Sequence, residues 1–171
     1  MRRLLPLALV LMLPACGLQP IYGGGVGNPV VEGLASVQVA PMPGRAGWLM
    51  ANALNDRLSV GGEAPVRYRL DIRLDDRLEG LGLLNDDTIG RERRTLRARY
   101  QLVDVATGAI VLDATSGSDA GIDVVSSEYA TIAAEQTALE RLTVEVADQI
   151  VTNISLALRN GAGQAAAAQG Q

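Results

Sequence analysis

Two residue types in this chain carry chemistry that its other residues do not supply. Cys16 is the only cysteine, and it directly follows the apolar run that ends at Ala15. A thiol is nucleophilic enough to accept a diacylglycerol through a thioether, and a small neighbour leaves the backbone accessible to a peptidase. Arginine is the second type, because its planar guanidinium can bind a phosphate through two charge-assisted hydrogen bonds.

The first fifteen residues have the parts of a bacterial lipoprotein signal peptide. Arg2 and Arg3 form the charged start, an apolar stretch runs from Leu4 to Leu13, and a small residue precedes the cysteine. The stretch is too short for a permanent transmembrane helix, which needs about twenty residues. We therefore predict that residues 1–15 are removed and that Cys16 is lipidated. The alternative is an ordinary secretory signal that is cut elsewhere and leaves a lone buried cysteine.

The arginines require strands to position them. Alternation of apolar and polar residues predicts three consecutive antiparallel strands, over 66–78, 91–105 and 109–115. A short strand over 34–40 and an amphipathic helix that stops at Gly61-Gly62 precede them, and Ser126 or Ser127 can cap a long final helix. We expect an α+β fold in the order β-α-β-β-β-α. Two helices would cover one face of a four-stranded, mostly antiparallel sheet.

Apolar spacing predicts which face of each helix is buried. In the first helix this face comprises Trp48, Leu49, Ala51, Ala53, Leu54 and Leu58. In the last helix it comprises Ile132, Leu139, Leu142, Val146, Ile150, Ile154 and Ala157. Trp48 and Leu49 could instead contact a partner, but an apolar stripe at helical spacing more often belongs to the core.

Composition predicts the limits of the domain. Residues 16–32 are rich in glycine and should form a flexible tether behind the lipidated cysteine. The folded domain should then cover 33–160, with a disordered, low-complexity tail over 161–171. Within the domain we expect loops over 80–90 and around Gly117 and Gly121.

Eight arginines share the polar face of the two long predicted strands. They are Arg67, Arg69, Arg73, Arg77, Arg91, Arg93, Arg97 and Arg99. This face could bind a phosphate-bearing ligand. The alternative is a solvated strand face whose arginines pair across strands with Asp71 and Asp75, which would blunt aggregation.

Several function classes are disfavoured by what the sequence lacks. It contains no histidine, and it shows no nucleophile elbow, phosphate loop or carboxylate pair in a matching context, so we expect no enzyme. Asp86-Asp87-Thr88 fits a calcium loop poorly, and we expect no metal and no cofactor. The net charge is −4, and loss of Arg2 and Arg3 with the signal leaves 13 basic against 19 acidic residues, or −6. That balance argues against nucleic acid as a partner.

Three short segments carry a resemblance to a known family. Cys16-Gly17-Leu18-Gln19-Pro20-Ile21-Tyr22-Gly23 is close to a family start of Cys-Gly-Phe-x-Pro-Leu-Tyr-Gly, with leucine in place of phenylalanine. Tyr100-Gln-Leu-Val-Asp-Val-Ala-Thr-Gly108 and Ser126-Ser127-Glu128-Tyr129-Ala130 follow in the expected order. The chain therefore resembles the lipopolysaccharide-assembly lipoproteins of the LptE family, in their alphaproteobacterial form.

The resemblance implies a function without catalysis. Members plug the barrel of the outer-membrane lipopolysaccharide translocon, LptD, and help that barrel assemble and accept lipopolysaccharide. It implies a lipid-anchored protein on the periplasmic side of the outer membrane, and Cys16 is the one position that its motifs carry over. On the functional interpretation of the eight arginines, their face would touch lipopolysaccharide or the acidic lumen of the barrel. The alternative is a stand-alone envelope lipoprotein that binds an amphiphile between sheet and helices, or scaffolds another envelope complex.

Overall fold

The computed structural model describes residues 29–62, 64–83 and 89–169. The described part forms an α+β fold, which confirms the predicted class. Its elements are helix α2 (Pro29–Ala35), strand β1 (Val37–Val39), helix α3 (Gly44–Leu58), the 3-10 turn η1 (Ser59–Gly61), strands β2 (Tyr68–Leu83), β3 (Ile89–Asp104) and β4 (Ile110–Asp123), and helix α4 (Glu128–Gln169).

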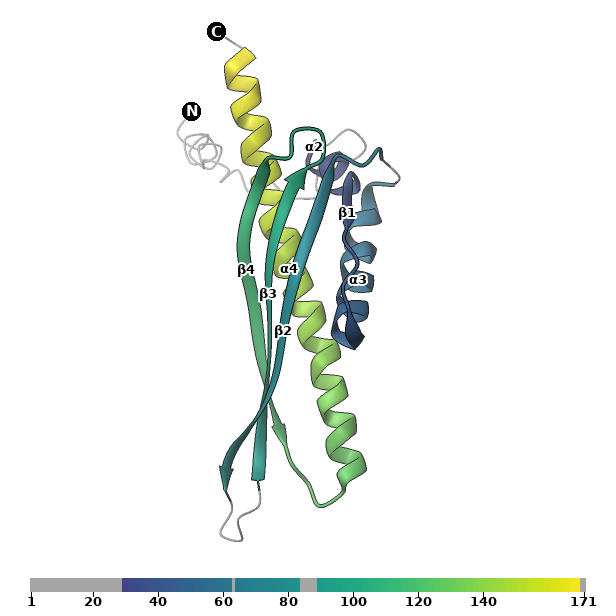
Figure 1. Ribbon diagram of the computed structural model, residues 1–171, viewed down its shortest axis with the longest axis vertical. Coiled ribbons are helices and arrows are strands. Elements are labelled where there is room, and N and C mark those ends of the chain that lie inside the picture. Colours follow the sequence, from purple (N-terminus) through teal and green to yellow (C-terminus); the bar gives the residue numbers. More distant parts are fainter. Residues whose placement is uncertain (1–28, 63, 84–88, 170–171) are drawn as a thin grey trace, which may run out of the picture.

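The four strands form one sheet in the order β1-β2-β3-β4 (Figure 1). β2, β3 and β4 are antiparallel neighbours, while short β1 runs parallel to the first residues of β2, from Val37 opposite Tyr68 to Val39 opposite Leu70. The sheet is therefore mixed and mostly antiparallel. Because β1 is so short, the rest of β2 forms an open edge of the sheet in the described structure.

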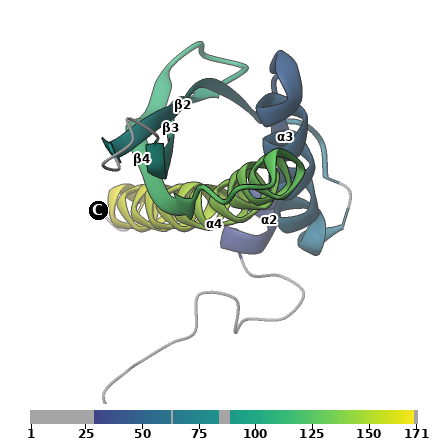
Figure 2. The same cartoon turned by 90° about the horizontal axis from the view of Figure 1, so that it is seen from below.

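The helices lie on one side of the sheet, and the other side is open (Figure 2). α4 runs along the whole sheet, and α3 lies beside it next to β1 and the upper part of β2 (Figure 1). α2 packs against α4 and η1. It is a third helix where two were predicted, and it includes residues 29–32 that the sequence analysis assigned to the tether.

Strict alternation along β2 and β3 separates a core face from a solvent face. The even-numbered side chains turn toward the helices, and Leu70, Leu96, Tyr100 and Leu102 are completely or almost completely buried. α3 contributes Met50, Ala53, Leu54 and Leu58 to the same core. Trp48 was predicted to belong there, but 64% of it is exposed, whereas Leu49 is partly buried against the core.

Helix α4 supplies the largest share of the core. Leu139, Leu142, Val146, Ile150 and Ile154 are buried in one stripe, as their spacing predicted. Ile132 lies about two turns before Leu139, the first residue of α4 in the core, and is exposed, contrary to prediction. Ser127 caps the first turn: its hydroxyl accepts a hydrogen bond from the Ala130 amide at 3.4 Å. The helix continues to Gln169, into the segment 161–171 that was predicted to be disordered.

The strands extend further than alternation alone indicated. β2 continues to Leu83 and β3 begins at Ile89, so strand residues occupy both ends of the predicted loop over 80–90. Asp86-Asp87-Thr88 lies outside the described residues. β4 includes Gly117 and Gly121, which were predicted to lie in a loop. Their glycine character suits positions opposite large arginines instead, since Gly117 faces Arg97 and Gly121 faces Arg93.

A buried polar network fixes α4 on the sheet. The Tyr100 hydroxyl lies 3.2 Å from the Ser116 hydroxyl, which joins β3 to β4. Asn153 of α4 donates from its amide nitrogen to the Tyr100 oxygen at 2.8 Å and to the Ser116 oxygen at 3.4 Å. Because these partners satisfy each other only in one alignment, the network sets how α4 lies along the strands.

Candidate functional site

The structure brings all eight predicted arginines to the outer face of the sheet. Each has an odd number, and the register pairs odd-numbered residues of β2 with odd-numbered residues of β3 on the face away from the helices. Arg67 directly precedes β2, and its carbonyl accepts a hydrogen bond from the Val105 amide, which continues the pairing. All eight arginines are exposed. We call this surface the arginine face.

Six of these arginines form ion pairs with neighbouring carboxylates. Their guanidinium-to-carboxylate distances are 3.7 Å for Arg67–Asp104, 3.0 Å for Arg69–Asp71, 2.9 Å for Arg77–Asp75, 3.0 Å for Arg91–Asp123, 3.7 Å for Arg93–Asp119 and 3.3 Å for Arg99–Asp113. Asp71 and Asp75 thus pair with arginines two residues away on their own strand, not across strands as the alternative interpretation required. The pairing across strands comes from the carboxylates of β4 and, for Arg67, from Asp104 at the end of β3.

Hydrogen bonds stabilise the charged forms of the groups in these pairs. The pKa of Asp113 is lowered, first by the amide of Gln101, which donates to it at 2.8 Å, and then by Arg99. The pKa of Arg69 and that of Arg77 are raised by hydrogen bonds to Asp71 and Asp75 respectively. The charges of these arginines are therefore largely compensated within the protein.

Arg73 and Arg97 form no ion pair or hydrogen bond with any other residue of the described structure. They lie half-way along the arginine face, where Arg73 stands directly opposite Arg99 and Arg97 opposite Asp75. The carboxylate of Asp75 forms its ion pair with Arg77 and not with Arg97. Two arginines opposite each other repel, and the pairing of Arg99 with Asp113 offsets this only on the Arg99 side. An anion bound between Arg73 and Arg99 would relieve the rest. We call Arg73, Arg97 and Arg99 the mid-sheet cluster.

The surface around the mid-sheet cluster has room for a ligand. A hollow of about 510 Å³ is lined by Arg73, Arg99 and Gln101, and one of about 250 Å³ lies beside Arg97 and Gly117. A Cβ atom at Gly117 would lie 3.1 Å from Cγ of Arg97, so the glycine leaves space for the arginine stem to lie against β4. Arg73 and Arg99 thus border one hollow and Arg97 borders the other, so the cluster can present guanidinium groups to an anion at two places on the arginine face.

One charged site was missed by the sequence analysis. Arg94 and Asp76 point inward and form a bidentate pair, with distances of 2.8 Å from Nε to Oδ1 and 2.7 Å from Nη2 to Oδ2. Arg94 also donates to the Glu135 carbonyl of α4 at 2.9 Å, and its pKa is raised, chiefly by the hydrogen bond to Asp76. The doublets Asp75-Asp76 and Arg93-Arg94 interrupt the alternation, and that interruption was the available signal.

The described residues contain no helix that is both long and apolar enough to cross a membrane. They also contain no group of three or more histidine, cysteine or acidic side chains placed to hold a metal ion. Cys16 lies outside the described residues. Its lipidation stays a prediction.

Comparison with known proteins identifies the family. The family model of LptE, described as lipopolysaccharide-assembly, matches residues 34–154. The chain belongs to the LptE family. No curated protein matches the chain.

Solved structures agree with this assignment. A protein from Caulobacter crescentus CB15 described as a lipoprotein shares 27% identity with this LptE-family chain, with a TM-score of 0.66 over 78% of this chain and 98% of the other. The minor lipoprotein of Acinetobacter baumannii has 16% identity and a TM-score of 0.56, over 71% of this chain and 92% of that one. Rare lipoprotein B of Shewanella oneidensis has 11% identity and a TM-score of 0.55, over 73% of this chain and 96% of that one. At these lower identities the last two show a shared fold.

Proposed function

We propose that this LptE-family protein is an outer-membrane lipoprotein that occupies the lumen of the LptD barrel. There it supports assembly of the barrel and the passage of lipopolysaccharide to the outer leaflet. The family is a non-enzymatic lipoprotein family concerned with lipopolysaccharide assembly, which supports this role. The observation that carries the proposal is the uncompensated charge of Arg73 and Arg97 in the middle of an otherwise self-neutralised face.

The arrangement of charges favours a specific contact over a general attraction. An exposed, solvated arginine usually contributes little, and the paired arginines of this face already have partners. Arg73 and Arg99 instead stand opposite each other on two strands, with Arg97 two residues away on β3, and a phosphate or a barrel carboxylate between Arg73 and Arg99 would relieve their repulsion. Lipopolysaccharide carries phosphates on its lipid part, so it provides anions of the required kind.

The remaining surface suits a plug. The three helices of the described residues lie on the other side of the sheet, so none of these helices covers the arginine face along β2 and β3 (Figure 2). Lipidation at Cys16 would hold the domain at the periplasmic side of the outer membrane. The chain between Cys16 and Pro29 spans at most about 45 Å, which keeps the domain close to the bilayer.

The alternative of an amphiphile bound between sheet and helices is less well supported. Most of that space is filled by side chains such as Tyr100, Leu142 and Ile150, which are 1% exposed or less. Close-packed interiors of this kind do not accept a ligand without displacement of core residues. A hollow of about 690 Å³ does lie between β4 and the first part of α4, but charged residues, among them Asp119, Arg141 and Glu145, form part of its lining. A binding role on the arginine face needs no such displacement.

Site-specific photo-crosslinking in intact cells tests the proposal. A photo-reactive residue at position 73 or 97 of the lipidated protein should form adducts with the LptD barrel and with lipopolysaccharide. Matched probes at Gln136 and Thr152, exposed on α4, provide the comparison for a general envelope contact. Adducts with neither partner from positions 73 and 97 would overturn the proposal.

Variants separate the free arginines from the paired ones. Arg73→Gln with Arg97→Gln should weaken lipopolysaccharide binding by tenfold or more, since charged hydrogen bonds contribute about 1.5–3 kcal/mol each. Arg69→Gln with Arg77→Gln removes the same charge from the same face and should weaken binding by less than about threefold. Equal effects of the two pairs would show that only net charge matters. Mass spectrometry of the native N-terminus tests lipidation of Cys16 separately.

A further inference from the structure

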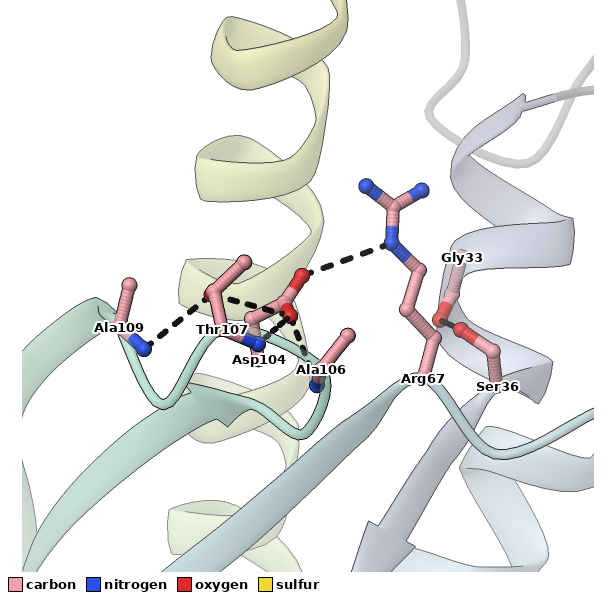
Figure 3. A network of polar contacts seen from close by, with 7 residues as sticks. All are labelled: Gly33, Ser36, Arg67, Asp104, Ala106, Thr107 and Ala109. Atoms are coloured by element: carbon pink, nitrogen blue, oxygen red, sulfur yellow. Dashed lines mark hydrogen bonds and ion pairs between the residues drawn. The ribbon is translucent and has the colours of Figure 1, made fainter.

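An apolar hollow lies at the end of the domain where β3 turns into β4. It has a volume of about 920 Å³ and lies between α2, the segment before β2, the β3–β4 hairpin and α4. The residues that form its apolar wall are Gly33, Val66, Val105, Val111, Ala157 and Leu158. We call it the hairpin-end hollow. Figure 3 shows the polar contacts beside it, with the lining residues Gly33 and Ser36 on one side and the turn from Asp104 to Ala109, which includes the lining residue Ala106, on the other.

Three aliphatic side chains around the hollow are largely exposed to solvent. Val66 is 53% exposed, Val105 54% and Val111 41%, and all three are β-branched side chains around one depression. Removal of apolar surface from water contributes about 25 cal/mol per Å² to the free energy of binding. A concave, apolar surface of this size therefore favours an apolar occupant.

Three polar residues at or beside the rim, Ser36, Asp104 and Arg67, already have partners, and the carboxylate-bearing Glu32 is exposed to solvent. The Ser36 hydroxyl donates to the Gly33 carbonyl at 2.7 Å. Asp104 accepts hydrogen bonds from the amides of Ala106 and Thr107 at 3.1 and 3.0 Å, and Arg67 lies 3.7 Å from its second oxygen (Figure 3). These groups need no ligand, so recognition in the hollow depends on apolar contact.

The course of the chain indicates which apolar residues are available. α2 contributes Gly33 to the hollow and begins at Pro29, so the segment 16–28 joins the domain beside it. That segment is mostly glycine and polar residues, with its bulkiest apolar pair at Ile21 and Tyr22. The chain from Tyr22 to Pro29 can span at most about 25 Å.

We propose that the hairpin-end hollow receives Ile21 and Tyr22 of this chain's own N-terminal segment. The docking is intramolecular, and a short linker gives an effective concentration in the millimolar range, so a weak apolar contact suffices. Docking shortens the free linker to the residues between Cys16 and Ile21, about 20 Å at most. The anchor would then hold the hairpin end of the domain toward the membrane.

Disulfide formation tests the proposal on the full mature chain with Cys16→Ser, which leaves no natural thiol. Gly23→Cys is combined with Ala106→Cys at the rim of the hollow, so that Ile21 and Tyr22 stay intact. The matched control combines Gly23→Cys with Ser59→Cys in η1. This element also packs against α2, but Ser59 does not line the hollow. We expect the first pair to form its disulfide at least about tenfold faster than the second.

Further variants identify the cause of the difference. Ile21→Ser with Tyr22→Ser should bring the two rates to within about twofold of each other, and so should Val111→Ser in the hollow. Equal rates in the parent pairs, or rates that ignore these substitutions, would overturn the proposal. Binding of the Cys16→Ser protein to phosphatidylethanolamine–phosphatidylglycerol vesicles that depends on Val66 and Val111 would assign the hollow to lipid instead. None of these results depends on LptD or lipopolysaccharide.

Discussion

The two faces of the sheet use the same residue type in opposite ways. Arg94 on the inner face is completely engaged, with two hydrogen bonds to Asp76 and one to the Glu135 carbonyl. Arg97, three residues later on the outer face, has no partner among the described residues, and neither has Arg73. An arginine whose charge is matched inside the protein supports the fold. One whose charge is left unmatched is available to another molecule.

This difference predicts a sharp division between stability and binding. Substitutions on the inner face should lower the free energy of unfolding and leave ligand affinity unchanged in the folded fraction. Substitutions of the mid-sheet cluster should do the reverse. Four measurements test this division, three on stability at the inner face and its margins and one on the cluster itself.

The largest effect is expected in the core. Ile150 is completely buried between α4 and the sheet. Ile150→Ala leaves a cavity and should lower the free energy of unfolding by about 2–5 kcal/mol. Urea denaturation measures the loss, and Val144→Ala on the exposed side of α4 is the control, with an expected change below about 0.5 kcal/mol. A small loss at Ile150 would mean that α4 packs less tightly than the structure shows.

Alternation made the inner and outer faces predictable, because a period of two assigns each strand residue to one side. The same rule failed at Asp76 and Arg94, since it takes charged residues to be outward and only the register shows that they can satisfy each other inside. The apolar spacing of α3 likewise could not show that Met50 is buried in the core while Trp48 is exposed. Pro29 at a first helical position and Glu32 in the first turn were signals for α2, hidden by the surrounding glycines.

The mid-sheet cluster could be predicted only in part. The sequence placed eight arginines on one face, but which of them remain unpaired depends on the register of three strands. Arg97 is free because Gly117 lies opposite it on β4, whereas Arg99 is close enough to reach Asp113. The register depends on hydrogen bonding along whole strands, and it cannot be predicted from the spacing of residues within one strand.

A smaller effect is expected at the inner ion pair. Arg94→Ala leaves the half-buried carboxylate of Asp76 without its partner and should lower the free energy of unfolding by about 1–3 kcal/mol. The control is Arg91→Ala, which breaks the exposed pair with Asp123 and should cost less than about 1 kcal/mol. Equal losses of unfolding free energy for the two variants would mean that the inner ion pair of Arg94 contributes no more to stability than an exposed ion pair on the outer face.

The hairpin turn provides a smaller, pH-dependent effect. The pKa of Asp104 is lowered, first by the Thr107 amide and then by the Thr107 hydroxyl and the Ala106 amide, against a raising effect of burial. A lowered carboxylate pKa adds stability above the unfolded-state value, and this stability is lost as the pH falls through the folded-state value.

Asp104→Asn should therefore lower the melting temperature at pH 7. The melting temperatures of the variant and the parent protein should become equal once the pH falls below the lowered pKa of Asp104. Thermal unfolding from pH 7 to pH 2.5 measures this. Glu140→Gln, at an exposed pair with Arg45, is the control and should show no comparable pH dependence. A constant difference between Asp104→Asn and the parent at every pH would contradict the assignment.

The smallest effect on stability is expected where the effect on function is largest. Arg73→Gln with Arg97→Gln removes two side chains that have no partner in the described structure, and it relieves the repulsion between Arg73 and Arg99. The free energy of unfolding should change by less than about 0.5 kcal/mol, or rise slightly. Paired urea titrations of this variant and of Arg69→Gln with Arg77→Gln measure the difference. A loss above about 1 kcal/mol in the first variant would mean that the cluster serves the fold, and that its charge is not held free for a ligand.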